Sequence, residues 1–352
     1  MLEEKPKSRP GKPKTPSDTP SGGTRTRPAK TSVVTSPPTP AEPSATATGP
    51  THPPSIHNQF VGRQDVVASE EQQLPVNETA TRPSRTGRDL PVAIGVGVGL
   101  AALVVASLVF SRTAFLAVLL AAVLISLREL TSALGSARVR APLVPLVLGS
   151  SAMIAVTWLS GPSGLAVTTI LTVLACLIWR LSDGPVGYFR DASTAVLITA
   201  YVPLLACFAV LMLRPDDGAT RIVAFILTVV CSDVGGFVAG VLFGKRPMAP
   251  TVSPKKSWEG LAGSVLACMV AGMLLVGIAL DGLWWQGVLY GAAIALTATL
   301  GDLGESIVKR DLRIKDMGTL LPGHGGLMDR MDSLLPSAAV AYLLLSLFLG
   351  TD

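Results

Sequence analysis

One short stretch of the sequence, residues 301–332, holds an unusual density of side chains that can bind metal ions and phosphate. If the stretch begins as a helix, four polar residues stand at positions i, i+3, i+4 and i+7 and share one face: Asp302, Glu305, Ser306 and Lys309. Asp329 and Asp332 repeat the i, i+3 spacing further on. Carboxylate oxygens suit Mg²⁺ that also holds phosphate oxygens. Two acidic helix faces are therefore predicted to meet over one cavity.

A glycine-rich centre, Leu321–Gly326, lies between the two acidic faces. Glycine allows close backbone approach and positive φ, which loops that cradle phosphate require. His324 in this centre is suited to bind phosphate or orient an acid, or it only fixes the loop. The plain alternative is a solvated loop with ion pairs near the bilayer surface. The phased acids, the many bases and the glycines together favour a phosphate-handling site.

A second cluster surrounds Asp233, which lies inside the apolar run 222–243. An unpaired carboxylate at such a position costs about 2.5–3.5 kcal/mol on insertion scales. Asp233 is therefore expected to face a polar cavity, or else to pair with a neighbouring helix. Residues Ser253–Gly260 follow this run, and Lys255 and Lys256 among them suit phosphate. Their plain alternative is an ordinary basic loop at a membrane surface.

The elements that must position these clusters are membrane helices. The chain of 352 residues is 49% hydrophobic and only 15% charged, against about 25% in soluble domains. Most of its apolar runs approach the roughly 20 residues that cross a bilayer. The prediction is an all-α, polytopic membrane protein of about nine transmembrane helices, of which 113–127 is the weakest: 90–110, 113–127, 141–159, 161–179, 192–213, 222–243, 261–280, 283–300 and 333–350.

Charge placement predicts the orientation. With a cytoplasmic N-terminus and nine spans, the outside loops carry only Arg112, Arg214 and Arg221, and the other loop bases lie inside. This is a strong positive-inside bias. It puts both clusters on the cytoplasmic side and the C-terminus outside, in the plasma membrane. The net charge of +5 thus reflects a membrane protein and not a nucleic-acid partner.

The chain divides into two predicted domains. Residues 1–89 are rich in Pro, Ser, Thr and basic residues, a composition typical of a disordered cytoplasmic tail. Such a tail either keeps the protein soluble or acts as a regulatory or docking arm. Residues 90–352 form the transmembrane domain, with catalytic segments 233–260 and 301–332. The four cysteines lie in apolar runs, and two of the three histidines lie in the tail, which excludes a multi-histidine metal site.

The stretch from Ser306 to Asp332 resembles the signature of the phosphatidate cytidylyltransferases, also called CDP-diacylglycerol or CDP-diglyceride synthases. The elements of the resemblance are a serine, basic and acidic pairs, and two closing motifs: Ser306, Lys309-Arg310, Lys315-Asp316, His324-Gly325-Gly326 and Asp329-Arg330-Met331-Asp332. The segment Ser253–Gly260 and the surroundings of Asp233 are similar to a second block of the family. The likeness covers roughly 90–350.

The resemblance implies an enzyme of phospholipid biosynthesis that joins the CMP part of CTP to phosphatidate and releases diphosphate. It also implies a homodimer in contact with membrane lipids. The implied cofactor is Mg²⁺, as one or two ions, and a monovalent cation such as K⁺ is compatible with the resemblance. The implied metal ligands are Asp302 and Asp329, with Asp233 as a further candidate. The expected catalytic residues are Asp302, Lys309, Lys315, His324, Asp329, Arg330 and Asp332. The residues expected to bind substrate phosphates are Ser253, Lys255, Lys256, Ser306, Arg310, Gly325 and Gly326.

Two other classes remain open from the residues themselves. A CTP-dependent polyprenol kinase or a CDP-alcohol phosphotransferase also combines acids, bases and spans, although the Asp-Gly…Ala-Arg…Gly…Asp…Asp pattern typical of the latter is not found. A cation-coupled transporter or channel would explain Asp233. It would not explain an acidic, glycine-rich loop at headgroup depth.

Overall fold

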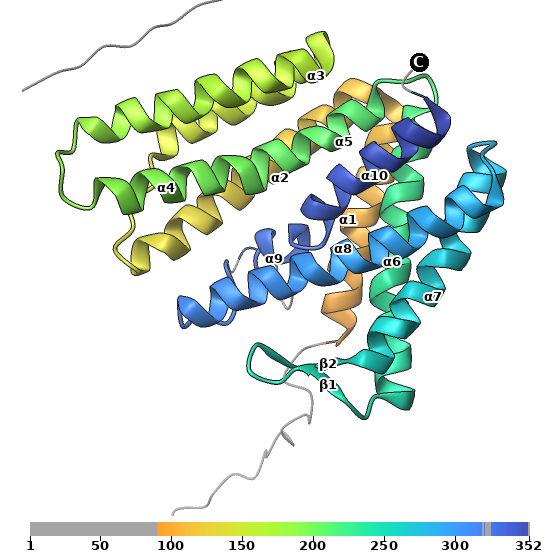
Figure 1. The fold of residues 1–352 in the computed structure, drawn as a ribbon. Helices are drawn as coiled ribbons and strands as arrows, with labels where there is room; N and C mark the ends of the chain where they lie inside the picture. Colours follow the sequence, from red (N-terminus) through yellow and green to blue (C-terminus); the bar gives the residue numbers. More distant parts are fainter. Residues whose placement is uncertain (1–89, 319, 321–324, 351–352) are drawn as a thin grey trace, which may run out of the picture. The chain divides into compact units, whose positions relative to one another are not determined.

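The computed structural model describes residues 90–318, 320 and 325–350. The predicted tail, residues 1–89, lies outside this part, so its disorder and the domain boundary stay predictions. The described chain is almost entirely helical (Figure 1), in the order α1 Leu90–Phe110, α2 Arg112–Ser136, α3 Leu143–Leu181, α4 Tyr188–Thr199, η1 Ala200–Leu204, α5 Leu205–Leu213, α6 Gly218–Phe243, β1 Pro247–Ala249, β2 Ser253–Ser257, α7 Trp258–Leu274, η2 Leu275–Ala279, α8 Trp284–Asp311, α9 Met328–Met331 and α10 Leu334–Leu349.

The predicted number of spans is confirmed for the described residues. Seven helical stretches are long and apolar enough to cross a membrane, with α4, η1 and α5 forming one of them. One stretch, α3, reverses at Gly161, where φ is +67° and Pro162 follows, so it contributes two antiparallel passes. The side chain of Thr172 in the second pass lies against Gly149 in the first. Together with α1, whose apolar part Gly95–Phe110 is shorter, the described helices agree with about nine passes.

Two helices run on beyond their apolar runs. The weakest predicted span, 113–127, is the middle of α2, which begins at a Ser111 cap and continues through Arg128 and Glu129 to Ser136. The eighth predicted span, 283–300, continues as a helix past Leu300 to Asp311 in α8, which meets the condition on which the shared acidic face depends. Both extensions are polar but contain no glycine pair or proline that would stop a helix. Each carries charged side chains to the same end of the helices.

Helix α7 packs closely against both α6 and α8, and glycines make this possible. A Cβ at Gly263 of α7 would meet the Gly235 carbonyl of α6 at 2.7 Å. A Cβ at Gly291 of α8 would collide with the backbone of Cys268 in α7. Small residues at helix interfaces are the usual means of close packing in lipid. The three helices form the framework of the candidate site.

A short antiparallel hairpin, β1 and β2, connects α6 to α7. It adds two small strands to the predicted all-α class. The Ser257 hydroxyl at the end of β2 caps α7 by accepting from the Gly260 N–H at 3.0 Å. Glu259 accepts from the backbone N–H groups of Lys245 and Arg246, both at 3.2 Å. These bonds fix where the hairpin leaves and rejoins the helices, and hence where its lysines lie.

The loops predicted to lie outside meet at one end of the helices. Arg112 donates to the carbonyls of Arg214 at 3.3 Å and of Asp216 at 2.8 Å. Arg221 donates to the carbonyl of Gly350 at 2.9 Å, after the last helix. Contacts also join loops that are predicted to lie inside, since Arg190 bonds the Arg138 carbonyl and Arg310 bonds the Val252 carbonyl. The side of the membrane on which each set lies stays a prediction.

A buried ion pair holds the turn between α3 and α4. The Arg180 and Asp191 residues are 2% and 0% exposed, and the guanidinium donates to the carboxylate at 2.7 and 3.1 Å. Arg180 also pairs with Asp183 at 2.9 Å. Arg190, which pairs with Asp191 at 3.0 Å, donates to the Arg138 carbonyl at 2.6 Å. The turn is thereby tied to the chain that enters α3.

Candidate active site

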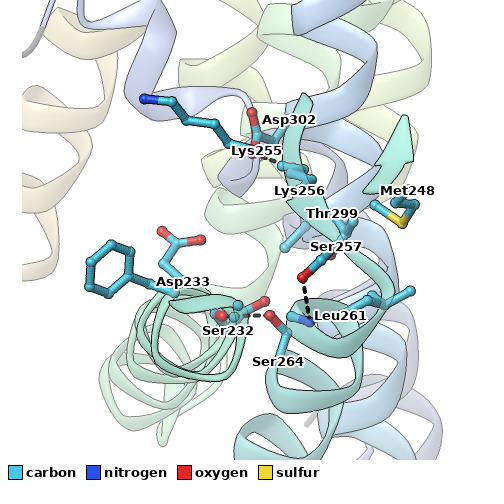
Figure 2. A pocket seen from close by; sticks show the side chains of 15 residues that line it. Ser232, Asp233, Met248, Lys255, Lys256, Ser257, Leu261, Ser264, Thr299 and Asp302 are labelled. Atoms are coloured by element: carbon cyan, nitrogen blue, oxygen red, sulfur yellow. Dashed lines mark hydrogen bonds and ion pairs between the residues drawn. The ribbon is translucent and has the colours of Figure 1, made fainter. Parts of the chain in front are cut away.

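A polar cavity of about 210 Å³ opens between α6, the β1–β2 hairpin, α7 and α8 (Figure 2). Its wall includes two carboxylates and two lysines, which are Asp233, Asp302, Lys255 and Lys256. Serine and threonine side chains of the three helices complete the polar lining. Below them the Ser264 hydroxyl of α7 donates to the Ser232 carbonyl of α6 at 2.7 Å. The cavity therefore combines acids with bases, as a site for phosphate and a cation requires.

Asp233 lines this cavity, as expected for a carboxylate inside an apolar helix. Figure 2 shows its carboxylate pointing away from α6, toward the side on which Asp302 and the hairpin lysines lie. The charges of several groups from other elements act on it: Asp302, Asp332, Lys256 and Arg330. Asp233 is thus part of a group of charges drawn from α6, β2, α8 and α9–α10.

Asp302 and Lys256 form an ion pair across the cavity, joining α8 to β2. Both side chains are partly exposed, at 40% and 25%, so the pair is accessible from the cavity. A second bond joins α8 to the turn of the hairpin, because Arg310 donates to the Val252 carbonyl at 3.3 Å. The hairpin is therefore held over the polar end of α8.

A more buried network lies along the same face of α8. Lys309 Nζ donates to Glu305 Oε2 at 2.8 Å and to Asp329 Oδ1 at 2.9 Å. The Glu305 and Asp329 residues are only 2% and 8% exposed. Asp332 lies against Glu305 as well. The two acidic faces predicted from the i, i+3 spacings do meet, and a lysine joins them.

Asp329 also organises the loop that precedes α9. Its carboxylate accepts from the Met317 N–H at 3.0 and 3.2 Å and from the Gly326 N–H at 2.7 Å. Gly325 has φ of +83°, which agrees with the expectation that this glycine-rich centre needs positive φ. His324 lies outside the described residues, so its predicted role stays a prediction. Three of the site residues predicted from sequence, Lys309, Gly326 and Asp329, are thus joined by hydrogen bonds.

The remaining predicted residues lie around these two networks. Ser253 begins β2, Ser306 is half-buried on α8, and Lys315 is exposed in the loop that follows α8. Arg330 is exposed on α9. Asp332 accepts from the Ser333 N–H at 2.7 Å and is buried. Close packing brings these residues near α8, because Gly301 lies directly against the Asp332 carbonyl.

The donor set can be compared with what a divalent cation needs. Mg²⁺ usually takes one or two carboxylates, and waters and substrate phosphates supply the rest. Asp233 and Asp302, partly open on one cavity, fit that pattern. Within the described residues no three His, Cys, Asp or Glu side chains are grouped as a ready-made metal site. Both oxygens of Asp329 already accept from N–H donors, which sets Asp329 apart from the other two acids.

A profile of the cytidylyltransferase family matches residues 92–348. The chain belongs to this family. It is 43% identical over 289 residues to the phosphatidate cytidylyltransferase of Mycobacterium leprae, covering 77% of this chain and 92% of that protein. It is 41% identical over 283 residues to the phosphatidate cytidylyltransferase of Mycobacterium tuberculosis H37Rv, covering 77% and 86%. The phosphatidate cytidylyltransferase of Helicobacter pylori 26695 is 40% identical over 161 residues, 46% of this chain and 60% of that protein.

This member of the cytidylyltransferase family has three residues at its site that sequence reasoning did not select. Glu305 was placed on the acidic face but given no role, and it proves to hold Lys309. Tyr201 of η1 has a buried hydroxyl with no hydrogen-bond partner among the described residues, and the charges of Asp302, Glu305 and Asp332 act on it. No local pattern marks Tyr201, because it lies in an apolar run.

The third such residue is Glu129 of α2, whose carboxylate accepts from the Met328 N–H at 2.8 Å. The two residues are 199 positions apart. Its only sequence signal is its neighbour Arg128, which suggested the end of a span. A contact between such distant segments is invisible to spacing arguments.

Proposed function

We propose that this protein is a phosphatidate cytidylyltransferase that converts CTP and phosphatidate to CDP-diacylglycerol and diphosphate. The observation that carries the proposal is the cavity in which Asp233 and Asp302 face Lys255 and Lys256, at the polar end of membrane-spanning helices. Membership of the cytidylyltransferase family and the names of the relatives support the same reaction. A transporter would not need a lysine pair beside the acids at this end.

The chemistry is an exchange of one phosphorus–oxygen bond for another. A phosphatidate oxygen forms a bond to the α-phosphorus of CTP, and the bond from that phosphorus to the β-phosphate oxygen breaks. The attacking group is a phosphate monoester with a second pKa of about 6, so it is largely ionised at neutral pH and needs no strong base. The difficulty is to bring two polyanions together, which makes positioning and positive charge decisive.

The basic side chains supply this charge. Lys255 and Lys256 are on the hairpin at the cavity and would bind the triphosphate, with Lys256 exchanging its contact with Asp302 for a phosphate oxygen. Lys309, which bonds Asp329 of α9, and the exposed Arg330 of α9 would neutralise the charge that develops on diphosphate as it leaves. The exposed side chain of Lys315 would complete the set. Serine and threonine hydroxyls of the cavity would orient the phosphate oxygens.

Asp302 and Asp233 would hold a divalent cation, for which we propose Mg²⁺. When bound, this cation supplies positive charge to the CTP phosphates that lysines alone cannot match. Asp329 is the other ligand implied by the family resemblance, and its oxygens now accept from Lys309 and two backbone N–H groups. A ligand role for Asp329 therefore requires Lys309 to turn to a substrate phosphate. A monovalent cation such as K⁺ could share these acids.

The site is proposed to face the cytoplasm of a plasma membrane protein, with the C-terminus outside. The positive-inside bias of the loops supports this orientation. CTP would then arrive from water, while phosphatidate would enter from the leaflet with its acyl chains still in lipid. A homodimer, implied by the family resemblance, is part of the same proposal.

The proposal is tested with purified protein in detergent supplied with phosphatidate, CTP and Mg²⁺, by measuring CDP-diacylglycerol. Asp302→Asn should abolish product formation while the protein elutes and unfolds like the wild type. The matched control is Asp311→Asn, an exposed acid at the end of the same helix, which should keep full activity. Wild-type protein that makes no CDP-diacylglycerol would contradict the function. Activity that survives in Asp302→Asn would contradict the site.

A further inference from the structure

Glu129 connects a helix remote in sequence to the loop that carries Asp329. It lies on α2, near the end that projects beyond the apolar run. Its Oε2 accepts from the backbone N–H of Met328, at 2.8 Å, where α9 begins (Figure 1). The cavity that binds substrate in the proposed function is lined by α6, α7, α8 and the hairpin, with no residue of α2 among its lining. The contacts that connect Glu129 to the site therefore run through the segment that carries Asp329.

Two glycines of this loop, Gly318 and Gly326, lie directly against the Glu129 carboxylate. A Cβ at Gly318 or at Gly326 would collide with the Glu129 side chain. The two glycines lie close to each other, since the same Cβ at Gly326 would be 2.7 Å from the Gly318 nitrogen. At Gly326 the nearby backbone leaves no room for a side chain, whereas at Gly318 a methyl group would displace the Glu129 carboxylate itself. Such close approach is not needed by an acid that merely projects into solvent.

The same short segment is held from its other side by Asp329. The Gly326 N–H donates to Asp329 at 2.7 Å, and the Met317 N–H, next to Gly318, donates to it at 3.0 Å. Glu129 and Asp329 therefore both contact the backbone around Gly318 and Gly326. Asp329 in turn accepts a hydrogen bond from the Lys309 ammonium. A shift of the loop would move the Asp329 carboxylate and with it Lys309.

The chemistry of Glu129 also suggests more than a contribution to stability. Its Oε1 is buried and has no hydrogen-bond partner among the described residues. Burial of an oxygen without a partner is unfavourable. A residue present only to stabilise the packing of α2 would be better replaced by an apolar one. The unfavourable burial of Oε1 is explained if Glu129 is needed to hold the loop in position for the reaction.

We propose that Glu129 is a positioning residue for the transfer reaction, which holds the loop before α9 so that Asp329 and Lys309 keep their orientation toward the substrate phosphates. This inference rests on the proposed function. Correct placement of charged groups can be worth large factors, because a misplacement of about 1 Å can cost roughly 100-fold in rate. The effect should appear in kcat and not in the KM for CTP, since the lysines of the hairpin are untouched.

The test compares Glu129→Ala and Glu129→Gln with Arg128→Ala, an exposed neighbour on the same helix. Glu129→Ala should lower kcat by about 10- to 100-fold, with KM for CTP close to the wild-type value. Glu129→Gln keeps an oxygen that accepts from the Met328 N–H, so it should recover most of kcat. Hydrogen exchange of the Met328 amide should accelerate in Glu129→Ala alone. Arg128→Ala should match the wild type in both measurements.

A second variant keeps the inference testable if Glu129→Ala folds poorly. Gly318→Ala places a methyl group against the Glu129 carboxylate and should lower kcat in the same way. Hydrogen exchange of the Met328 amide should also accelerate in this variant, because the same carboxylate is displaced. Wild-type kcat together with wild-type exchange at Met328 in Gly318→Ala would contradict the inference.

Three results would overturn the inference: wild-type kcat in Glu129→Ala, equal losses in the Gln and Ala variants, or unchanged exchange at Met328. A wild-type protein without activity would instead contradict the proposed function, and exchange at Met328 would still test the contact.

Discussion

Removal of Lys309 should leave two nearly buried carboxylates without their shared cation. Glu305 and Asp329 receive the Lys309 ammonium at 2.8 and 2.9 Å, and their side chains are only 1% and 4% exposed. At an effective dielectric constant of about 20, each contact represents roughly 6 kcal/mol of attraction before desolvation is subtracted. Breaking a buried pair from one side typically costs about 3–5 kcal/mol. Lys309→Met should therefore lower the free energy of unfolding by at least about 3 kcal/mol.

A second substitution separates this loss of stability from the loss of activity. Glu305→Gln removes one of the two orphaned charges, so the double variant Lys309→Met/Glu305→Gln should regain part of the lost stability. It should not regain activity, because the cation proposed to neutralise diphosphate is still missing. The assay is an SDS titration of the detergent-solubilised protein, with CDP-diacylglycerol formation measured in parallel. A Lys309→Met variant as stable as the wild type would refute the reasoning, and so would a fully active double variant.

Three further predictions follow from single contacts. Tyr201→Phe removes a buried hydroxyl without a partner among the described residues, so stability should be unchanged or slightly higher while turnover falls about tenfold. Unchanged turnover would show that the hydroxyl does not serve the acids near it. Asp191→Asn leaves the buried Arg180 with the partly exposed Asp183 as its charged partner among the described residues and with a long bond to the Val186 carbonyl, so SDS titration should show a loss of about 3 kcal/mol. Gly161→Ala should lower the free energy of unfolding by about 1–3 kcal/mol in the same titration, because φ is +67° and the Arg214 guanidinium fills the space of a Cβ. Wild-type stability would mean that the turn does not need glycine.

Much of the framework could be predicted because helix and membrane periodicities are local. The apolar runs 141–159 and 161–179 were separate predictions, and the reversal at Gly161 agrees with them. The face shared by Asp302, Glu305 and Lys309 follows from the helical repeat, once α8 is known to run past Leu300. Physical rules that act within a few turns of one helix were sufficient for these features.

The features that could not be predicted depend on contacts between distant segments. The hairpin strands are short and contain prolines, so they show no alternation of apolar and polar residues. The partner of each acid is likewise a tertiary property: Asp302 pairs with Lys256, and Asp329 pairs with Lys309. The sequence offers several lysines to each of them. Spacing predicts which residues share a face, and only packing decides which of them meet.

The proposed function is tested most directly by following the position of a radioactive label in CTP. The purified protein would be given phosphatidate and Mg²⁺ with CTP labelled at either the α- or the γ-phosphate, and lipid would be separated from water. Nucleotidyl transfer predicts that the α-label enters the lipid and the γ-label leaves as diphosphate, and that EDTA stops both. A γ-label found in lipid would contradict nucleotidyl transfer and show a kinase. An α-label absent from lipid in folded protein would contradict the account as a whole.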